Sequence, residues 1–269
     1  MKGRVLLVAS SDSSGGTGIP ADIKAVTALK GYAMPAITGI TAQDSSAVRG
    51  VHHVPPEFIA LQMRVVLRDL GADAVKVGLM LSAPVVEAIA NVLAADAAGV
   101  PLVLDPIFNA TGGTLKLDGE GHAALTRRLA FVATLLTPNL EEAALLCGAD
   151  AITSLDEQRT AAEMLRTIGA SAVLLKGGRG AGREVHDVLA TADGVEVFTA
   201  PRVDTPHTRG IGSTLAAAIA TGLAQRMDLR SAIMRARAYV RQALAAAPRY
   251  GQGRGALNHP VTVSPFAGG

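Results

Sequence analysis

Residues 4–18 read RVLLVASSDSSGGTG and combine three features that decide the fold. The first six, 4–9, are mostly aliphatic, which predicts a strand that is buried on both faces. A run of small residues follows from Ser10 to Gly18, and a helical pattern over 19–30 begins directly after it. A strand, a Gly-rich turn and a helix in this order form the opening unit of an α/β fold.

The same alternation continues along the chain. Further strands are expected at 36–41, 74–77, 102–104, 132–136 and 172–175, and further helices at 56–70, 83–98, 119–130, 140–147, 156–168, 213–226 and 229–246. The segments 185–189 and 195–199 flank a short turn, which predicts an antiparallel hairpin at a sheet edge. This order implies a central, mainly parallel sheet with helices on both faces, and residues 1–269 are expected to form a single domain.

The composition excludes several classes of protein. Hydrophobic residues make up 49% of the chain and the net charge is +2, which fits neither a disordered chain nor a nucleic-acid-binding protein. No apolar run reaches the ~18 residues of a membrane span, so no membrane contact is expected. Cys147, the single cysteine, cannot form an internal disulfide, and no basic-then-apolar leader opens the chain, so a cytoplasmic protein is expected.

Ligands bind open α/β sheets at the carboxyl ends of the strands, so polar segments at these positions are candidate sites. The strongest runs from Asp204 to Ser213 and leads into an Ala-rich helix. Its residues Gly210, Ile211, Gly212 and Ser213 would point several backbone N–H groups at one anion. The alternative is a Gly-rich cap with Ser213 as the N-cap. In the run that ends at Gly18, a substrate loop is favoured over a plain turn.

Three other segments are open to two interpretations. Asp105 can hold Mg²⁺, but on its own an Asp-Pro turn is the simpler interpretation. Asn139 and Glu142 are three residues apart at a helix start and can face one site, although on spacing alone an ordinary N-cap is the better interpretation. Lys176 opens a Gly-rich run that suits a phosphate, and a flexible hairpin connection is equally favoured. The sequence lacks the G-x-x-x-x-G-K-[ST] motif, and no G-x-G-x-x-G follows the first strand.

Taken together and in this order, the segments resemble the ribokinase superfamily. More narrowly, the chain is similar to the bacterial hydroxymethylpyrimidine/phosphomethylpyrimidine kinases of thiamine biosynthesis over almost its whole length. The stretches that carry this resemblance are 11–16, 18–24, 40–44, 51–58, 74–78 and 251–259. It implies a ribokinase-like, three-layer fold and ATP-dependent phosphorylation of 4-amino-5-hydroxymethyl-2-methylpyrimidine, and then of its monophosphate.

The resemblance also implies roles for particular residues. The pyrimidine would lie near Asp12, Gly18, Gln43 and Met80, and the nucleotide near Lys176, Thr208 and Gly210. The turn Gly210–Ser213 would hold the transferring phosphoryl group. Mg²⁺ would be organised by Asp105, Asn139 and Glu142. Members of the superfamily often form dimers, so a homodimer is expected.

The chain departs from the family pattern at the turn before the Ala-rich helix and in the stretch 106–113. The family text reads Thr-His-Gly-Thr-Gly-Cys, whereas this chain has Thr208-Arg209-Gly210-Ile211-Gly212-Ser213. A serine hydroxyl is a poor base, so Ser213 predicts a bias toward the monophosphate, whose phosphate oxygen is already anionic. Two alternatives remain: a pyridoxal/pyridoxine kinase, and a non-catalytic sensor that binds a pyrimidine or a nucleotide.

Overall fold

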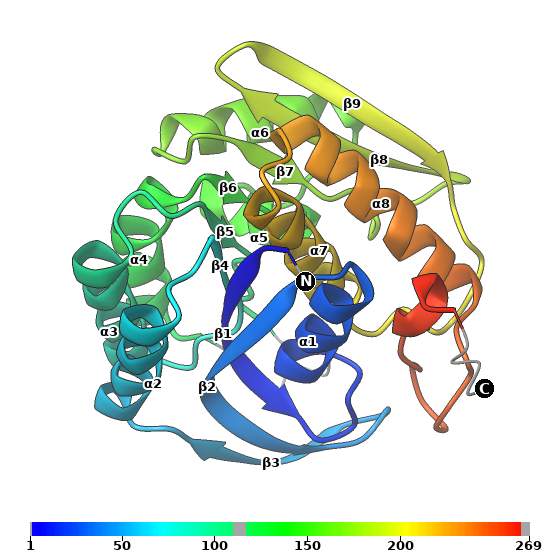
Figure 1. Ribbon diagram of the computed structural model, residues 1–269. Helices are drawn as coiled ribbons and strands as arrows, with labels where there is room; N and C mark the ends of the chain where they lie inside the picture. Colours follow the sequence, from blue (N-terminus) through cyan, green and yellow to red (C-terminus); the bar gives the residue numbers. More distant parts are fainter. Residues whose placement is uncertain (1, 110–116, 265–269) are drawn as a thin grey trace.

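The structure is a computed structural model that describes residues 2–109 and 117–264, so 110–113 of the unusual stretch lie outside the described residues. A nine-stranded sheet is covered by helices on both faces, which gives three layers (Figure 1). The strand order is β3-β2-β1-β4-β5-β6-β7-β8-β9. The strands from β2 to β7 are parallel, and β3, β8 and β9 pair antiparallel. The expected three-layer α/β fold with a central, mainly parallel sheet is confirmed.

The strands alternate with the helices along the chain. The strands are β1 Arg4–Asp12, β2 Tyr32–Gln43, β3 Val48–His53, β4 Ala74–Val77, β5 Leu102–Leu104, β6 Leu135–Leu136, β7 Val173–Leu175, β8 Glu184–Thr191 and β9 Gly194–Pro201. The helices are α1 Gly18–Ala28, α2 Pro56–Asp69, α3 Ala83–Asp96, α4 Gly119–Arg128, α5 Leu140–Cys147, α6 Leu155–Thr167, α7 Ile211–Ala224 and α8 Leu229–Ala245. Two 3₁₀ turns are η1 Ala130–Val132 and η2 His259–Thr262.

The two faces of the sheet bury separate hydrophobic cores. One core lies under α2 to α6, and the other lies under α1, α7 and α8 (Figure 1). The central strands β4 and β5 are buried along their whole length, as expected for strands covered on both faces. The second core depends on small side chains: Ala216 to Ala220 are almost entirely buried, and a Cβ on Gly222 would lie 2.6 Å from that of Ala232. Close packing of α7 and α8 therefore explains the Ala-rich helix.

The structure corrects several expected boundaries. The strand expected at 132–136 shrinks to Leu135–Leu136, because Val132 ends the 3₁₀ turn η1. The strand β3 was not expected, since an exposed edge strand carries little hydrophobic signal. Helix α7 begins at Ile211, and its N-cap is Gly210 rather than Ser213. The hairpin β8–β9 at the sheet edge is confirmed.

One charged side chain interrupts the buried strands. Lys76 in β4 is fully buried, and its ammonium lies 2.7 Å from the carboxylate of Asp22 in α1, which is also fully buried. An unpaired charge at this depth would be strongly destabilising, so each of the two residues requires the other.

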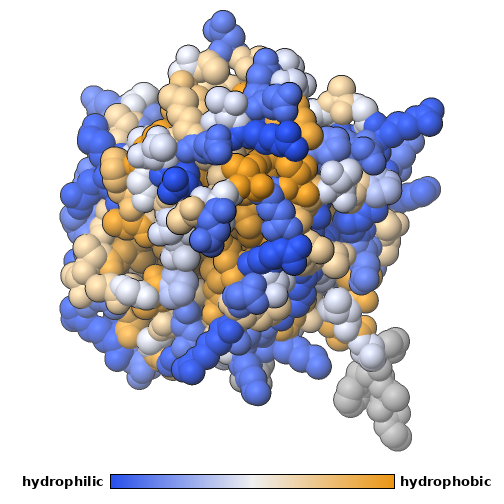
Figure 2. Space-filling view, turned by 90° about the horizontal axis from the view of Figure 1, so that it is seen from above, coloured by the Kyte–Doolittle hydropathy of each residue, from blue (hydrophilic) through white to orange (hydrophobic). Residues whose placement is uncertain are grey.

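None of the described helices is both long and apolar enough to cross a membrane. The face of the molecule in Figure 2 mixes hydrophilic and hydrophobic residues, with hydrophilic side chains surrounding the apolar ones. Because apolar atoms make up about half of an ordinary protein surface, this mixture does not by itself indicate a partner.

Candidate active site

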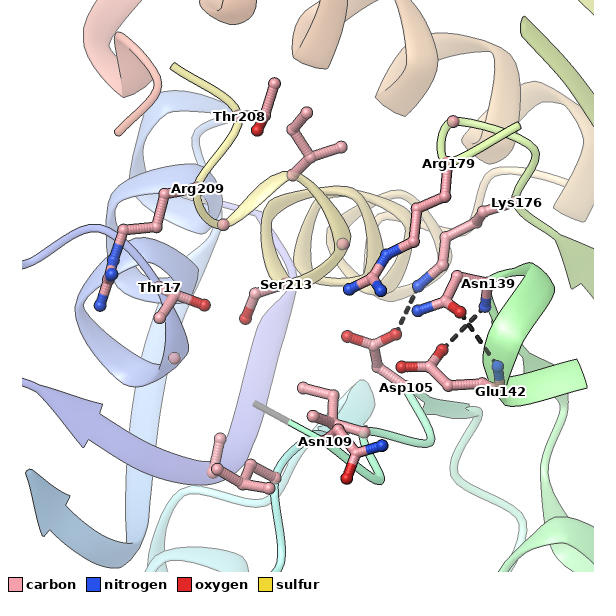
Figure 3. Close-up of a pocket in the computed structure, with 18 of the residues that line it drawn as sticks. Thr17, Asp105, Asn109, Asn139, Glu142, Lys176, Arg179, Thr208, Arg209 and Ser213 are labelled. Carbon is pink, nitrogen blue, oxygen red and sulfur yellow. Dashed lines mark hydrogen bonds and ion pairs between the residues drawn. The ribbon is translucent and has the colours of Figure 1, made fainter. Parts of the chain in front are cut away.

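A cavity of about 530 Å³ opens at the carboxyl ends of the central strands. Its size is typical of a small-molecule site. The walls come from the segments that follow β1, β4, β5, β6 and β7, and from the start of α7 (Figure 3). Of the site residues expected from the sequence, the cavity is lined by Gly18, Gln43, Asp105, Asn139, Glu142, Lys176, Thr208, Gly210, Ile211, Gly212 and Ser213.

Asp12 and Met80, which were expected to lie near the substrate, do not line the cavity. The carboxylate of Asp12 accepts hydrogen bonds from the backbone N–H groups of Ser14, Gly16 and Thr17, at 2.9, 3.2 and 3.1 Å. It therefore shapes the loop that follows β1. Met80 is 1% exposed and packs into the core under α2 to α6, while its neighbour Leu79 lines the cavity.

Close backbone packing joins this loop to the turn before α7. Gly210 has a φ of +82°, and a Cβ there would lie 2.0 Å from the carbonyl oxygen of Gly16. Gly18 has a φ of +58°, and a Cβ there would lie 2.2 Å from the carbonyl oxygen of Ser10. Both positions require glycine for conformation and for space. The two segments therefore form one continuous wall of the cavity.

The start of α7 presents the anion-binding geometry that the sequence indicated. The first backbone N–H groups of a helix have no partner within the helix, and the helix dipole adds positive potential. At this helix they belong to residues 211–213, which all line the cavity. A bound phosphoryl oxygen can accept hydrogen bonds from them.

Lys176 and Asp105 form an ion pair in the wall of the cavity. The ammonium lies 2.7 Å from Asp105 Oδ1 (Figure 3). The hydroxyl of Thr137 donates to the same oxygen at 3.2 Å. Burial alone would lower the pKa of Lys176, but Asp105 and Glu142 outweigh it and raise that pKa. Lys176 is therefore a cation at neutral pH. Its backbone N–H donates to the carbonyl of Pro138 at 2.8 Å, which holds the ends of β6 and β7 together.

The Gly-rich run after Lys176 connects β7 to β8, and it is held in place. The guanidinium of Arg202 donates to the carbonyl oxygens of Gly178, Gly180 and Gly182, at 2.7, 2.6 and 2.9 Å. The run is thus the connection between the antiparallel strands β7 and β8. It is also part of the cavity wall, since Gly178 and Arg179 line the cavity.

Asn139 and Glu142 form a capping box at the start of α5. Asn139 Oδ1 accepts from the backbone N–H of Glu142 at 3.0 Å, and Glu142 Oε2 accepts from the N–H of Asn139 at 2.7 Å. Burial raises the pKa of Glu142 to about 7, although Lys176 opposes the rise. The alternative interpretation of these two residues as a helix cap is therefore confirmed, and both still line the cavity.

The donor set of the cavity fits Mg²⁺. This ion prefers oxygen ligands and is usually held by one or two carboxylates together with waters and substrate phosphates. Asp105 and Glu142 supply two carboxylates. A bound cation would oppose the rise in the pKa of Glu142 that burial causes. Among residues 2–109 and 117–264, no cluster of three or more His, Cys, Asp or Glu forms a complete protein cage. Phosphate oxygens and water would therefore complete the coordination.

The cavity also includes residues for which the sequence predicted no individual role, among them Thr17, Asn109, Arg179 and Arg254, although Thr17 and Arg179 lie in segments that were candidate sites. Arg254 donates to the hydroxyl of Thr208 at 2.7 Å, so the stretch 251–259 reaches the segment that precedes α7. Arg179 pairs with Glu141. The arginines Arg179 and Arg254 in Gly-rich runs were the signal that the sequence offered. The direction in which their side chains point depends on the tertiary fold.

The cavity brings Lys176, the carboxylates of Asp105 and Glu142 and the start of α7 together at the carboxyl edge of a mainly parallel sheet. An arrangement of this kind neutralises and positions a phosphoryl group. The class of protein that the fold and the cavity define is a phosphotransferase of ribokinase-like fold.

The sequence profile of the phosphomethylpyrimidine kinase family matches residues 12–258. The chain belongs to this family. It is 41% identical over 256 residues to a hydroxymethylpyrimidine/phosphomethylpyrimidine kinase of Rhizobium meliloti, which covers 94% of this chain and 96% of the relative. It is 42% identical over 258 residues to a thiamine biosynthesis bifunctional protein of Geobacter sulfurreducens, which covers 96% of this chain. The chain spans about half (52%) of that relative.

Among solved structures, the chain is similar to an ADP complex of pyridoxal kinase from Bacillus subtilis. The TM-score is 0.89 at 30% identity, and the alignment covers 97% of this chain and 98% of the other.

Proposed function

We propose that the chain acts as a single domain and uses ATP to phosphorylate 4-amino-5-hydroxymethyl-2-methylpyrimidine and its monophosphate, in thiamine biosynthesis. The observation that carries the proposal is the division of the cavity. Gln43, Gly18 and Leu79 line it on the side of β1, β2 and β4, and the anion-binding turn, Lys176 and the Gly-rich run line the rest. An aromatic alcohol and a nucleotide thus have separate places, with the start of α7 between them.

Each part of the cavity has a task in the transfer. Gln43 has an amide that can pair with the edge of an aminopyrimidine. Its Oε1 accepts from the hydroxyl of Thr41 at 2.9 Å, which orients the amide. Lys176 and Thr208 bind nucleotide phosphates, and the N–H groups of residues 211–213 hold the oxygens of the transferring phosphoryl group. Positioning and charge neutralisation then account for catalysis of an in-line transfer.

Mg²⁺ would be held by Asp105 and Glu142, with Asn139 orienting Glu142. When bound, it supplies positive charge to the phosphate oxygens. Without it, Lys176 already balances the negative charge of Asp105.

The deciding experiment is ADP release from ATP and Mg²⁺ with the aminopyrimidine alcohol, its monophosphate and pyridoxal offered in parallel. We expect turnover of both pyrimidines. The matched control is Lys176→Met purified in the same way, which should lose turnover and thereby exclude a contaminating kinase. Saturable pyrimidine binding without ADP release would instead support the non-catalytic sensor.

A pyridoxal kinase is the second candidate function, and the likeness to the Bacillus subtilis pyridoxal kinase favours it. Turnover of pyridoxal with no turnover of either pyrimidine would replace the first proposal by this one.

We also propose that the protein acts in the cytoplasm as a homodimer. Phe58, Leu61 and Val65 are each about half exposed along α2, at 54%, 50% and 54%. Their spacing places them on one face of the helix, where a second copy can cover them. Light scattering after size-exclusion chromatography measures the mass, and Leu61→Lys should shift a dimer toward the monomer.

A further inference from the structure

Three buried side chains meet behind the anion-binding turn. Ser213 lies in the first turn of α7 and lines the cavity (Figure 3). Its hydroxyl donates to Asp22 Oδ1 at 2.7 Å, and Lys76 donates to the same hydroxyl at 3.1 Å. Lys76 also donates to Asp22 Oδ2 at 2.7 Å. Asp22 and Lys76 are fully buried, so Ser213 is the member of this group that reaches the cavity.

The hydroxyl of Ser213 retains one free acceptor position. A hydroxyl has one proton to donate and two lone pairs to accept with. The proton goes to Asp22, and one lone pair is taken by Lys76. The remaining lone pair can accept a hydrogen bond from a substrate hydroxyl that lies against α7.

We propose that Ser213 and Asp22 form a proton relay, in which Ser213 takes the proton of the substrate alcohol while its own proton passes to Asp22. This inference rests on the proposed function. In the transfer, the alcohol oxygen forms a bond to the γ-phosphorus of ATP, and the bond from that phosphorus to the β–γ bridging oxygen breaks. ADP leaves with that oxygen, Asp22 becomes a neutral acid, and Lys76 stays an ammonium.

The charges around Asp22 are compatible with this role. Burial raises the pKa of Asp22, the adjacent Lys76 and the Ser213 hydrogen bond oppose the rise, and the carboxylate of Asp105 adds to it from further away. A carboxylate with a raised pKa is a stronger base than one in water. The 2.7 Å contact with the Lys76 ammonium favours the charged form of the carboxylate. Asp22 therefore supplies the base that Ser213 alone lacks, which removes the reason for a bias toward the monophosphate.

The two substrates separate the relay from general damage to the site. The alcohol must lose a proton, whereas the monophosphate oxygen is already anionic near neutral pH, because the second pKa of a phosphate monoester is about 6. In both Asp22→Asn and Ser213→Ala, we expect kcat for the alcohol to fall about 10²–10⁴-fold with KM unchanged. The kcat for the monophosphate should fall far less. The double variant should be no slower than the slower single variant, because both residues act on one proton.

The control is Asp73→Asn, which makes the same chemical change at an ion pair with Arg4, at the amino ends of β1 and β4 and away from the residues that line the cavity. Ser213→Ala keeps the Asp22–Lys76 pair, so this variant tests the relay even if Asp22→Asn does not fold. Equal losses for both substrates, or unchanged alcohol turnover in Ser213→Ala, would overturn the relay. Failure of the wild type on both pyrimidines would instead count against the proposed function. The same variants would then be compared with pyridoxal, which is also an alcohol, and absence of that turnover too would overturn the relay.

Discussion

Arg209 and Asp12 lie 197 positions apart in the sequence and form a buried ion pair, in which the guanidinium is 3.3 Å from the carboxylate. The carboxylate of Asp12 holds the loop after β1 by accepting hydrogen bonds from the backbone N–H groups of that loop. Arg209 directly precedes the N-cap of α7. The pair therefore ties the two walls of the cavity together. Arg209, which replaces the histidine of the family text, therefore has a partner in Asp12.

Arg209→Ala is expected to destabilise the protein and to loosen the substrate loop. It leaves a buried carboxylate without its cation, which costs about 3 kcal/mol of unfolding free energy. The KM for the pyrimidine should rise as well, because the loop contributes Thr17 and Gly18 to the cavity. Urea unfolding and steady-state kinetics measure the two effects. The control is Arg230→Ala at the exposed pair with Glu196, which should change little; equal effects in the two variants would contradict the assignment.

Gly212→Ala should reduce turnover without unfolding the protein. The added Cβ would lie 3.2 Å from Lys176 Nζ and 3.7 Å from Asp105 Oδ2, so Lys176 must move away from its position against α7. We expect kcat to fall by about two- to tenfold for both pyrimidines, because the ammonium must shift by a few tenths of an ångström, and a misplacement of about 1 Å at a reacting centre costs about 10²-fold. Gly119→Ala at the start of α4, where a Cβ would meet no atom of the described residues within 4 Å, is the matched control. Wild-type kcat in Gly212→Ala would show that Lys176 does not depend on this close approach.

Asp105→Asn should raise the Mg²⁺ concentration that half-saturates the enzyme. The change removes one of the two carboxylates that would hold the ion, and loss of a group that supports a bound metal commonly costs about 10- to 100-fold in affinity. Thermal shifts with a non-hydrolysable ATP analogue and increasing Mg²⁺ report this without turnover. Asp73→Asn again provides the control. An unchanged Mg²⁺ midpoint would assign the ion to other groups.

Stability should fall in acid through His259. Burial lowers the pKa of this imidazole to about 4, from 6.5 in the unfolded chain, with Lys24 adding to the effect. Its Nε2 lies 3.0 Å from the hydroxyl of Thr214. Between about pH 6.5 and pH 4 the unfolded chain binds the proton and the folded protein does not. The His259 contribution to stability is therefore complete above that range and is lost as the pH falls through it.

The measurement is the unfolding free energy of the wild type and of His259→Gln across this range. The difference between the two should change by up to about 3 kcal/mol, because one pKa unit corresponds to about 1.4 kcal/mol. Replacement of the exposed His52 by Gln should leave the pH dependence unchanged. A constant difference between the wild type and His259→Gln would show that another group controls acid unfolding.

The order of the elements could be predicted from the sequence, because buried strands appear as short aliphatic runs and amphipathic helices as a repeat of about 3.6 residues. The exposed edge strand β3 carries little such signal, and the two-residue β6 is too short to display one. The placement of Gly210 as the N-cap of α7 depends on its approach to Gly16, a contact that local propensities do not encode.

Part of the candidate site could also be predicted from the sequence. Segments that follow strands were expected to meet, and Asp105, Lys176 and the start of α7 line one cavity. The direction in which each side chain points could not be predicted from the sequence. Asp12 turns toward its own loop, and Asp22 and Lys76 meet Ser213 below the cavity surface. Such contacts join residues far apart in the chain, so spacing alone does not reveal them.

The layer formed by α1, α7 and α8 joins the two ends of the chain, which has a consequence for synthesis on the ribosome. Helix α1 and strand β1 emerge early, but the helix that covers them, α7, emerges only after residue 224 has been made. Until then, one apolar face of the sheet remains open to water and Lys76 lacks its contact with Ser213. The nascent chain is therefore most exposed to aggregation and to chaperone binding just before its last two long helices appear.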